Sequence, residues 1–168
     1  MAEFSDPNAA VGAAAPTIEP VIWDATTEID GLIAITQNGL FEYGNVYRII
    51  FAQQQQTTVD LRLVTSGGGY LTGWVYTTST FDHELPTTPS GLGNINTHTL
   101  QFCTYAETIL HINGGGWHLS SNTIRPYNDN QQRRSRTGSS GSGLPDGLRF
   151  SFSNATAGRR ILVTKVTP

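Results

Sequence analysis

The chain has 168 residues, a formal net charge of −3 and a single cysteine, Cys103. A chain of this length fits one domain and buries about 70% of its unfolded surface, so a hydrophobic core can form without disulfides. The weak negative charge gives no long-range attraction to nucleic acid or anionic membranes, and one cysteine excludes both an intrachain disulfide and a zinc site built from several thiolates.

Residues 1–20 differ in composition from the rest of the chain. Residues 8–16 (NAAVGAAAP) are mostly small and end in a proline, a composition that buries little apolar surface and becomes ordered only against a partner. We therefore expect a flexible N-terminal arm over residues 1–20 that attaches the protein to others. The candidate assembly residues in this arm are Asn8, Val11, Pro16 and Ile18.

The remainder, residues 21–168, is expected to form one β-sandwich domain of many short strands. Three strands alternate large apolar residues with polar or small ones, which is typical of half-buried strands with one face on a core. The apolar residues that would share a face are Tyr47, Ile49 and Phe51; Val59, Leu61 and Leu63; and Leu148, Phe150 and Phe152. The predicted strands cover residues 19–24, 31–36, 46–52, 58–65, 72–79, 99–104, 108–112, 117–125, 131–137, 147–153 and 160–166.

Glycine-containing turns separate these strands. Asn38-Gly39, the SGGG run at 66–69, the NGGG run at 113–116 and Asp146-Gly147 are expected to supply residues with positive φ. The four glutamines at 53–56 would form a polar loop tip between two strands. Many short strands with glycine turns and no long amphipathic helix predict an all-β fold, an antiparallel β-sandwich of the jelly-roll type.

No pattern of catalytic residues stands out. Carboxylates cluster at 24–30 and 82–84, and two acids at a suitable separation can hydrolyse glycosides, but neither group lies in a recognisable motif. The four histidines are scattered, although His111 and His118 would lie on neighbouring strands, and Cys103 would act as a small buried hydrophobe. We therefore expect no enzyme activity, no metal and no cofactor.

Aromatic and arginine residues are the candidates for surface contacts. Exposed rings stack on sugars and anchor protein interfaces, whereas buried rings fill a sandwich core, and the sequence leaves both roles open. In strands, Trp74 and Tyr76 would share a face, and so would Arg134 and Arg136, with Arg133 opposite. Charged residues at these positions also protect an edge strand from stray pairing. The candidate ligand or receptor contacts are Trp74, Tyr76, Trp117, Tyr127, Arg133, Arg134 and Arg136.

Four segments carry a resemblance to a known group of proteins: YRIIF at 47–51, VDLRLVTSGG at 59–68, GWVY at 73–76 and DGLRFSFS at 146–153. On these segments the chain resembles small jelly-roll proteins of tailed-bacteriophage virions, over about residues 30–166. The resemblance implies a virion structural protein, such as a tail fibre, head fibre or decoration component.

The expected function is that of an outward-facing fibre, spike or decoration component, held to other virion proteins by the N-terminal arm. We expect a homo-oligomer, with a trimer favoured, that contacts cell-surface glycans of the host. Since no signal peptide or membrane span is visible, the protein would be made in the host cytoplasm and reside in the virion. The alternatives are a stand-alone carbohydrate-binding module, a capsid-stabilising protein without a receptor role, and a glycan hydrolase.

Overall fold

The computed structural model describes residues 19–26, 29–71, 75–80, 98–124, 131–139, 143–155 and 157–166; within these ranges, residues 55–58, 75–80, 98–103, 123–124 and 131–139 are described by their strand positions. The described residues form nine strands: β1 (Val21–Asp24), β2 (Ala34–Gln37), β3 (Val46–Val64), β4 (Val75–Thr80), β5 (His98–Asn113), β6 (Gly116–Ile124), β7 (Gln131–Ser139), β8 (Gly147–Phe152) and β9 (Arg159–Val166).

The strands pair in a nested antiparallel order. With β3 and β5 each divided into two halves, the first segment pairs with the last (β1 with β9) and the second with the last but one (β2 with β8). Residues 46–52 of β3 pair with residues 105–111 of β5, and residues 57–61 pair with residues 98–103. This nested order is the jelly-roll arrangement, which confirms the predicted all-β sandwich.

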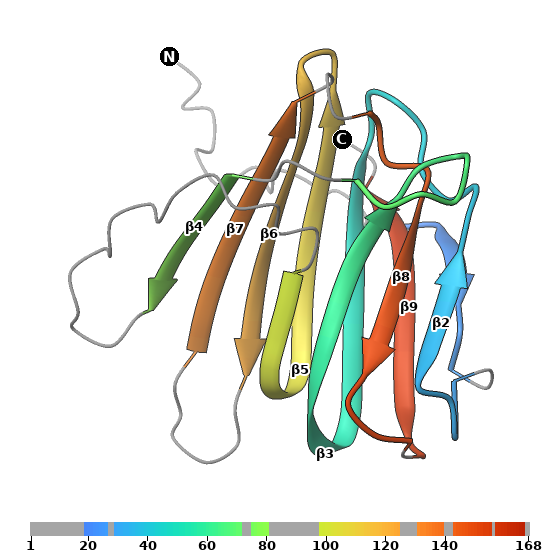
Figure 1. The fold of residues 1–168 in the computed structure, drawn as a ribbon, viewed down its shortest axis with the longest axis vertical. Helices are drawn as coiled ribbons and strands as arrows, with labels where there is room; N and C mark the ends of the chain where they lie inside the picture. The colour runs from blue at the N-terminus through green and yellow to red at the C-terminus, as the bar shows by residue number, and fades with distance from the viewer. Residues whose placement is uncertain are drawn as a thin grey trace, which may run out of the picture.

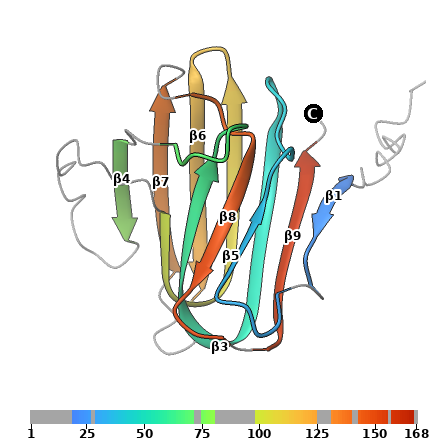
Figure 2. The ribbon, with the colours of Figure 1, turned by 45° about the vertical axis from the view of Figure 1, so that its right-hand side comes forward.

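Two layers result from this pairing. The first sheet runs β1, β9, the first half of β3, the second half of β5, β6, β7 and β4. The second sheet runs β2, β8, the second half of β3 and the first half of β5. Figure 1 shows β3 turning back at one end of the molecule, and Figure 2 shows β8 and β2 beside β9, on its left. Strands β6, β7 and β4 extend the first sheet sideways beyond the jelly-roll pairs (Figure 1).

The four glutamines at 53–56 lie inside β3 rather than in a loop between two strands. The register between β3 and β5 shifts between Ala52 and Thr57 and again before Val59, so the strand bends here while its pairing continues. The prediction of a loop tip is therefore wrong. A chain can turn the edge of a sandwich without leaving the extended conformation where irregular register increases the local twist.

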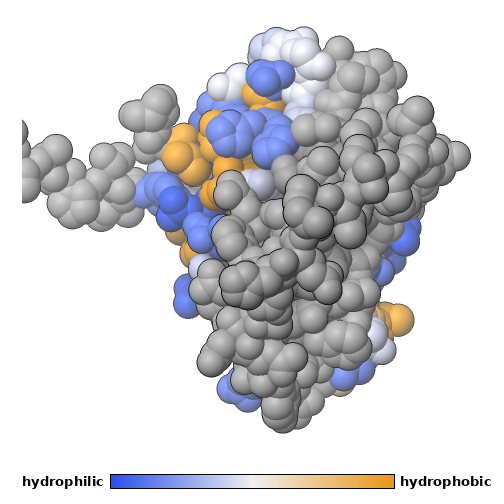
Figure 3. Space-filling model, turned by 90° about the vertical axis from the view of Figure 1, so that its left-hand side faces the viewer, coloured by the Kyte–Doolittle hydropathy of each residue, from blue (hydrophilic) through white to orange (hydrophobic). Residues whose placement is uncertain are grey.

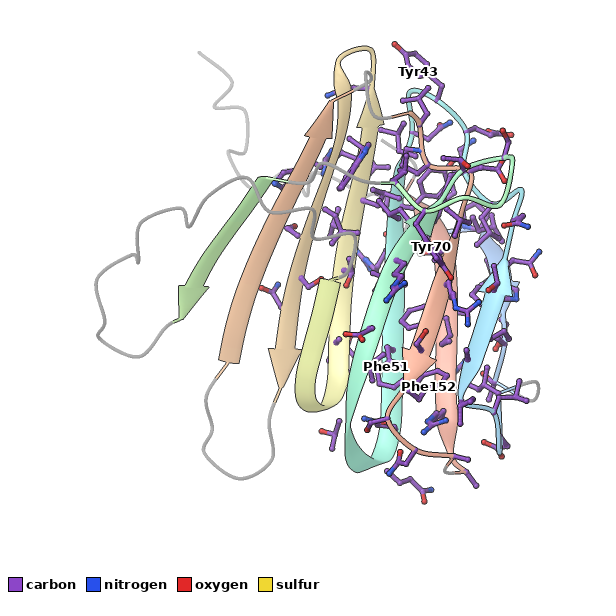
Figure 4. All side chains as sticks on the ribbon, viewed as in Figure 1. Tyr43, Phe51, Tyr70 and Phe152 are labelled. Atoms are coloured by element: carbon purple, nitrogen blue, oxygen red, sulfur yellow. The ribbon has the colours of Figure 1, made fainter. Side chains whose placement is uncertain are left out.

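The core lies between the two sheets and consists of the residues that the period-two pattern predicted. All nine residues of the three alternating strands are buried, at 0–6% exposure. The ring of Phe51 stacks on those of Phe150 and Phe152 from the opposite sheet, with both pairs of centroids 5.9 Å apart. Figure 4 shows Phe51 and Phe152 close together between the layers. These rings join the sheets where β3 turns from one to the other.

Glycine serves the turns in two different ways. Gly39, Gly68 and Gly116 have positive φ, as the sequence predicted. Gly147 does not belong to this group, so the prediction for it is wrong; a Cβ atom there would lie 2.1 Å from the carbonyl oxygen of Gln37. Gly147 is required by the close approach of β8 to the end of β2.

Asp146 holds this junction together. Its carbonyl oxygen accepts hydrogen bonds from the amides of Leu40 (2.8 Å) and Phe41 (3.0 Å), and its carboxylate accepts one from the amide of Gly39 (2.9 Å). Its own amide donates to the carbonyl of Val64 (2.8 Å). One residue therefore ties the loop after β2 to the end of β3.

A buried arginine holds the loop that joins the end of β8 to the start of β9. Arg159 is 1% exposed, and its guanidinium donates to the carbonyl oxygen of Leu32 (2.7 Å) and to the side-chain and backbone oxygens of Asn154. It also lies 4.0 Å from the ring centroid of Phe152. Burial lowers the pKa of this guanidinium, and the nearby negative charge of Asp30 partly offsets that lowering.

We expect Gly147→Ala to lower the free energy of unfolding by about 1–3 kcal/mol or more, because the new methyl group must displace backbone rather than a flexible side chain. Urea denaturation would measure this. Gly67→Ala is the matched control, since a Cβ there meets no atom closer than 3.9 Å and φ is not positive. Equal stability of the two variants would contradict the close-approach explanation.

We expect Arg159→Lys to lower the free energy of unfolding by about 1–3 kcal/mol. Lysine has one nitrogen, whereas the two terminal nitrogens of Arg159 donate separately to Leu32 and Asn154. Arg160→Lys is the neighbouring control; the Arg160 side chain is 56% exposed, and its nearest carboxylate oxygen, on Asp24, is 4.0 Å away. Thermal or urea unfolding would distinguish the two. A near-neutral Arg159→Lys would show that the buried guanidinium does not anchor these loops.

Candidate functional site

Trp117, one of the predicted ligand contacts, lies in the core. It is 2% exposed and stands opposite Ile112 at the β5–β6 turn. The next inward position on β6, Leu119, is fully buried opposite Leu110. The prediction of a receptor contact at Trp117 is therefore wrong, and the ring instead fills the end of the sandwich.

Four other predicted contacts lie on the strands that extend the first sheet. Tyr76 in β4 is the register partner of Arg136 in β7, which is itself opposite Leu119. Arg134 and Arg133 of β7 are the register partners of Thr78 and Ser79 in β4. The structure describes these residues by strand position alone, so the predicted sharing of faces stays a prediction. The remaining candidates, Trp74, Tyr127, Asn8, Val11, Pro16 and Ile18, lie outside the described residues, and Cys103 is described only by its strand position.

The two predicted neighbouring histidines do face each other across β5 and β6. His111 and His118 are register partners, and their ring centroids are 6.3 Å apart. Across the described ranges, however, no group of three or more histidine, cysteine or acidic side chains is placed to hold a metal ion. The described residues also contain no helix long and apolar enough to cross a membrane.

The outer face of the first sheet carries charges that balance one another. Arg48 in β3 forms ion pairs with Glu19 (3.1 Å) and with Glu107 of β5 (3.2 Å), and Glu19 also accepts a hydrogen bond from Thr164 of β9 (2.7 Å). Burial and the charge of Glu107 raise the pKa of the adjacent Tyr105, while Arg48 acts against them. Viewed from the side of β4, the described residues that are visible intersperse hydrophilic and hydrophobic groups (Figure 3). Arg48, Glu19 and Glu107 thus each have an oppositely charged partner among the described residues.

On the outer face of the second sheet, two of the described charges oppose each other. Arg62 of β3 and Arg149 of β8 are direct register partners, a position in which like charges repel. The guanidinium of Arg62 lies 4.9 Å from the ring centroid of Tyr70, and Nε of Arg149 donates a long hydrogen bond to Ser151 (3.4 Å). Among the described residues, no ion pair involves either arginine.

The surroundings of this arginine pair are short and polar. Thr36 of β2, which is exposed, is the register partner of Arg149 and completes a row across three strands. Tyr70 borders the pair with 37% of its surface exposed, and Figure 4 shows it apart from Phe51 and Phe152 along the length of the strands. We call this surface the arginine platform; it consists of Thr36, Arg62, Tyr70, Arg149 and Ser151.

The sequence analysis did not single out the two arginines of the platform. The sequence pattern that could have identified them is the same for both. Each arginine stands between two apolar residues that are buried, in LRL at 61–63 and LRF at 148–150. The alternation could have assigned each arginine to an outer face. Their pairing across β3 and β8 joins segments more than 80 residues apart in the chain, which periodicity does not reveal.

Comparison of the chain with models of known protein families and with curated proteins finds no match.

We expect Arg149→Gln to leave the free energy of unfolding unchanged or to raise it by about 0.2–1 kcal/mol, because it removes one of two opposed like charges. The gain should shrink as salt is added, since ions screen exposed charges. Arg48→Gln is the matched control and should lower stability, because Glu19 and Glu107 lose the cation they share. Chemical denaturation at two salt concentrations would test this, and equal destabilisation by both variants would contradict it.

Proposed function

We propose that this protein is a structural component of a bacteriophage virion, an outward-facing fibre, spike or decoration protein that contacts the host surface. The observation that carries the proposal is the nested jelly-roll pairing of the strands, because the double-sheet jelly roll recurs in viral capsid proteins and in lectins. The resemblance of residues 30–166 to phage jelly-roll proteins supports the same reading.

Two further features support a role in assembly rather than in catalysis. Only 14% of the residues are charged, against about 25% in typical soluble domains, so little charge has to be desolvated when copies pack together. On the outer face of the first sheet, the aliphatic residues Ile50, Ile109 and Leu162 are half-buried around the Arg48 ion pairs. A face of this composition is compatible with packing in a symmetric oligomer.

We expect the full-length protein to be a trimer or a larger assembly in solution, because a fibre or decoration protein acts through repeated copies. Size-exclusion chromatography coupled to light scattering, over a range of protein concentrations, would measure this. A second sample lacking residues 1–18 would show whether the arm contributes. A monomer at every concentration, in both samples, would contradict the virion proposal.

The second candidate function is a stand-alone carbohydrate-binding module. The arginine platform favours it, since exposed hydroxyl, guanidinium and aromatic groups together suit a saccharide. A monomer that binds glycans would favour this function, whereas an oligomer that binds none would favour a capsid-stabilising protein without a receptor role.

A further inference from the structure

The opposed arginines of the second sheet are the feature that packing leaves unexplained. Residues directly opposite in an antiparallel pair have Cβ atoms about 4.5–5.5 Å apart, and Arg62 and Arg149 occupy such a pair in the middle of a run of six paired residues. Neither contributes its guanidinium to the core, because both are only partly buried. An anion that accepts hydrogen bonds from both would turn this repulsion into a binding interaction.

The acidic group nearest along the strand does not supply that anion. Asp60 lies two residues before Arg62, on the same side of β3, and is the register partner of Ser151. It has an interaction of its own, but among the described residues it forms no ion pair with either arginine. Among the described residues of β3 and β8, the two guanidinium groups therefore outnumber the carboxylate on this side.

The fixed geometry of the pair favours a planar acceptor. The ring of Tyr70 restrains the guanidinium of Arg62, and Nε of Arg62 is buried without a hydrogen-bond partner in the described part of the chain. Stacking, rather than hydrogen bonding, thus positions this group. Arginine offers a rigid fork of donors that fits a carboxylate in a bidentate manner, so two adjacent forks suit a carboxylate or a similar oxyanion.

The rest of the platform favours a saccharide as the molecule that carries the carboxylate. Thr36 lies beside Arg149 on the neighbouring strand β2, and Ser151 lies two residues further along β8. Sugar hydroxyls pair well with the hydroxyl groups of such residues. The partly exposed ring of Tyr70 offers an apolar surface to the C–H groups of a sugar.

We propose that the arginine platform binds an acidic polysaccharide through the carboxylates of its sugar units. Arg62 and Arg149 would hold a carboxylate, Tyr70 would contact the sugar ring beside it, and Thr36 and Ser151 would bind hydroxyl groups. The inference goes beyond the virion proposal and holds equally for a stand-alone module.

Titration calorimetry on the full-length protein would test this with oligogalacturonate, hyaluronan and polysialic acid as probes. Methyl-esterified oligogalacturonate is the matched ligand control, because it keeps the sugar and loses the charge. We expect binding to at least one of the three acids, weaker binding as salt is added, and none to the ester. No binding to any of the acids, or equal binding to acid and ester, would overturn the proposal.

The double variant R62Q/R149Q tests the site. We expect it to lose about tenfold or more in affinity, because charge-assisted hydrogen bonds are the strong ones. R160Q, on the exposed side of β9 in the other sheet, is the matched control and should bind like the original protein. Unfolding curves would establish that the double variant is folded; a folded variant with full affinity would overturn the assignment.

Inorganic phosphate and a single-stranded oligonucleotide serve as competitors for the same measurement. We expect phosphate and the oligonucleotide to displace the glycan only at concentrations far above the dissociation constant of the glycan. Tighter binding of either competitor would replace the glycan with a general oxyanion or nucleic acid as the ligand. These results are independent of the oligomeric state, so failure of the glycan inference and failure of the virion proposal are distinguishable.

Discussion

The register of β3 is the constraint on which the rest of the structure depends. This one strand pairs with β9 and β5 in the first sheet and with β8 and β5 in the second. A slip of one residue would turn Tyr47, Ile49 and Phe51 to solvent, and it would have to occur against three partner strands at once. The bend at the four glutamines lets a single strand fix the registers of both layers, so the core positions of β3, β8 and β9 are determined together.

Polar contacts close the ends that the hydrophobic core leaves open. Asp146 satisfies backbone amides where the loop after β2 meets β8, and Arg159 satisfies backbone carbonyls before β2 and after β8. Both residues come from the last part of the chain and hold loops from the first part. Unpaired backbone groups at such sites would be costly away from water, so these two side chains help to keep β2 on the edge of the second sheet.

The two outer faces of the sandwich differ in how their charges are arranged. On the first sheet, Arg48 lies between two carboxylates, and little remains for an outside partner. On the second sheet, Arg62 and Arg149 face each other, and their partners in the described part of the chain are a tyrosine ring and a long hydrogen bond. The described charges of the two faces therefore differ in arrangement, although both sheets share β3.

By itself, the sequence determined the fold class, most strand positions, and the residues of each strand that share a face, because alternation and glycine turns are local properties. Apart from the hairpin that places His111 opposite His118, it could not determine which strands are neighbours, since hydrogen bonds in a jelly roll join distant segments. Only the tertiary structure decided that Trp117 is covered, that Gly147 is required by the backbone of Gln37, and that Arg62 meets Arg149. Each of these three features depends on which residue lies opposite in space, and the pairing and packing of the strands determine that residue.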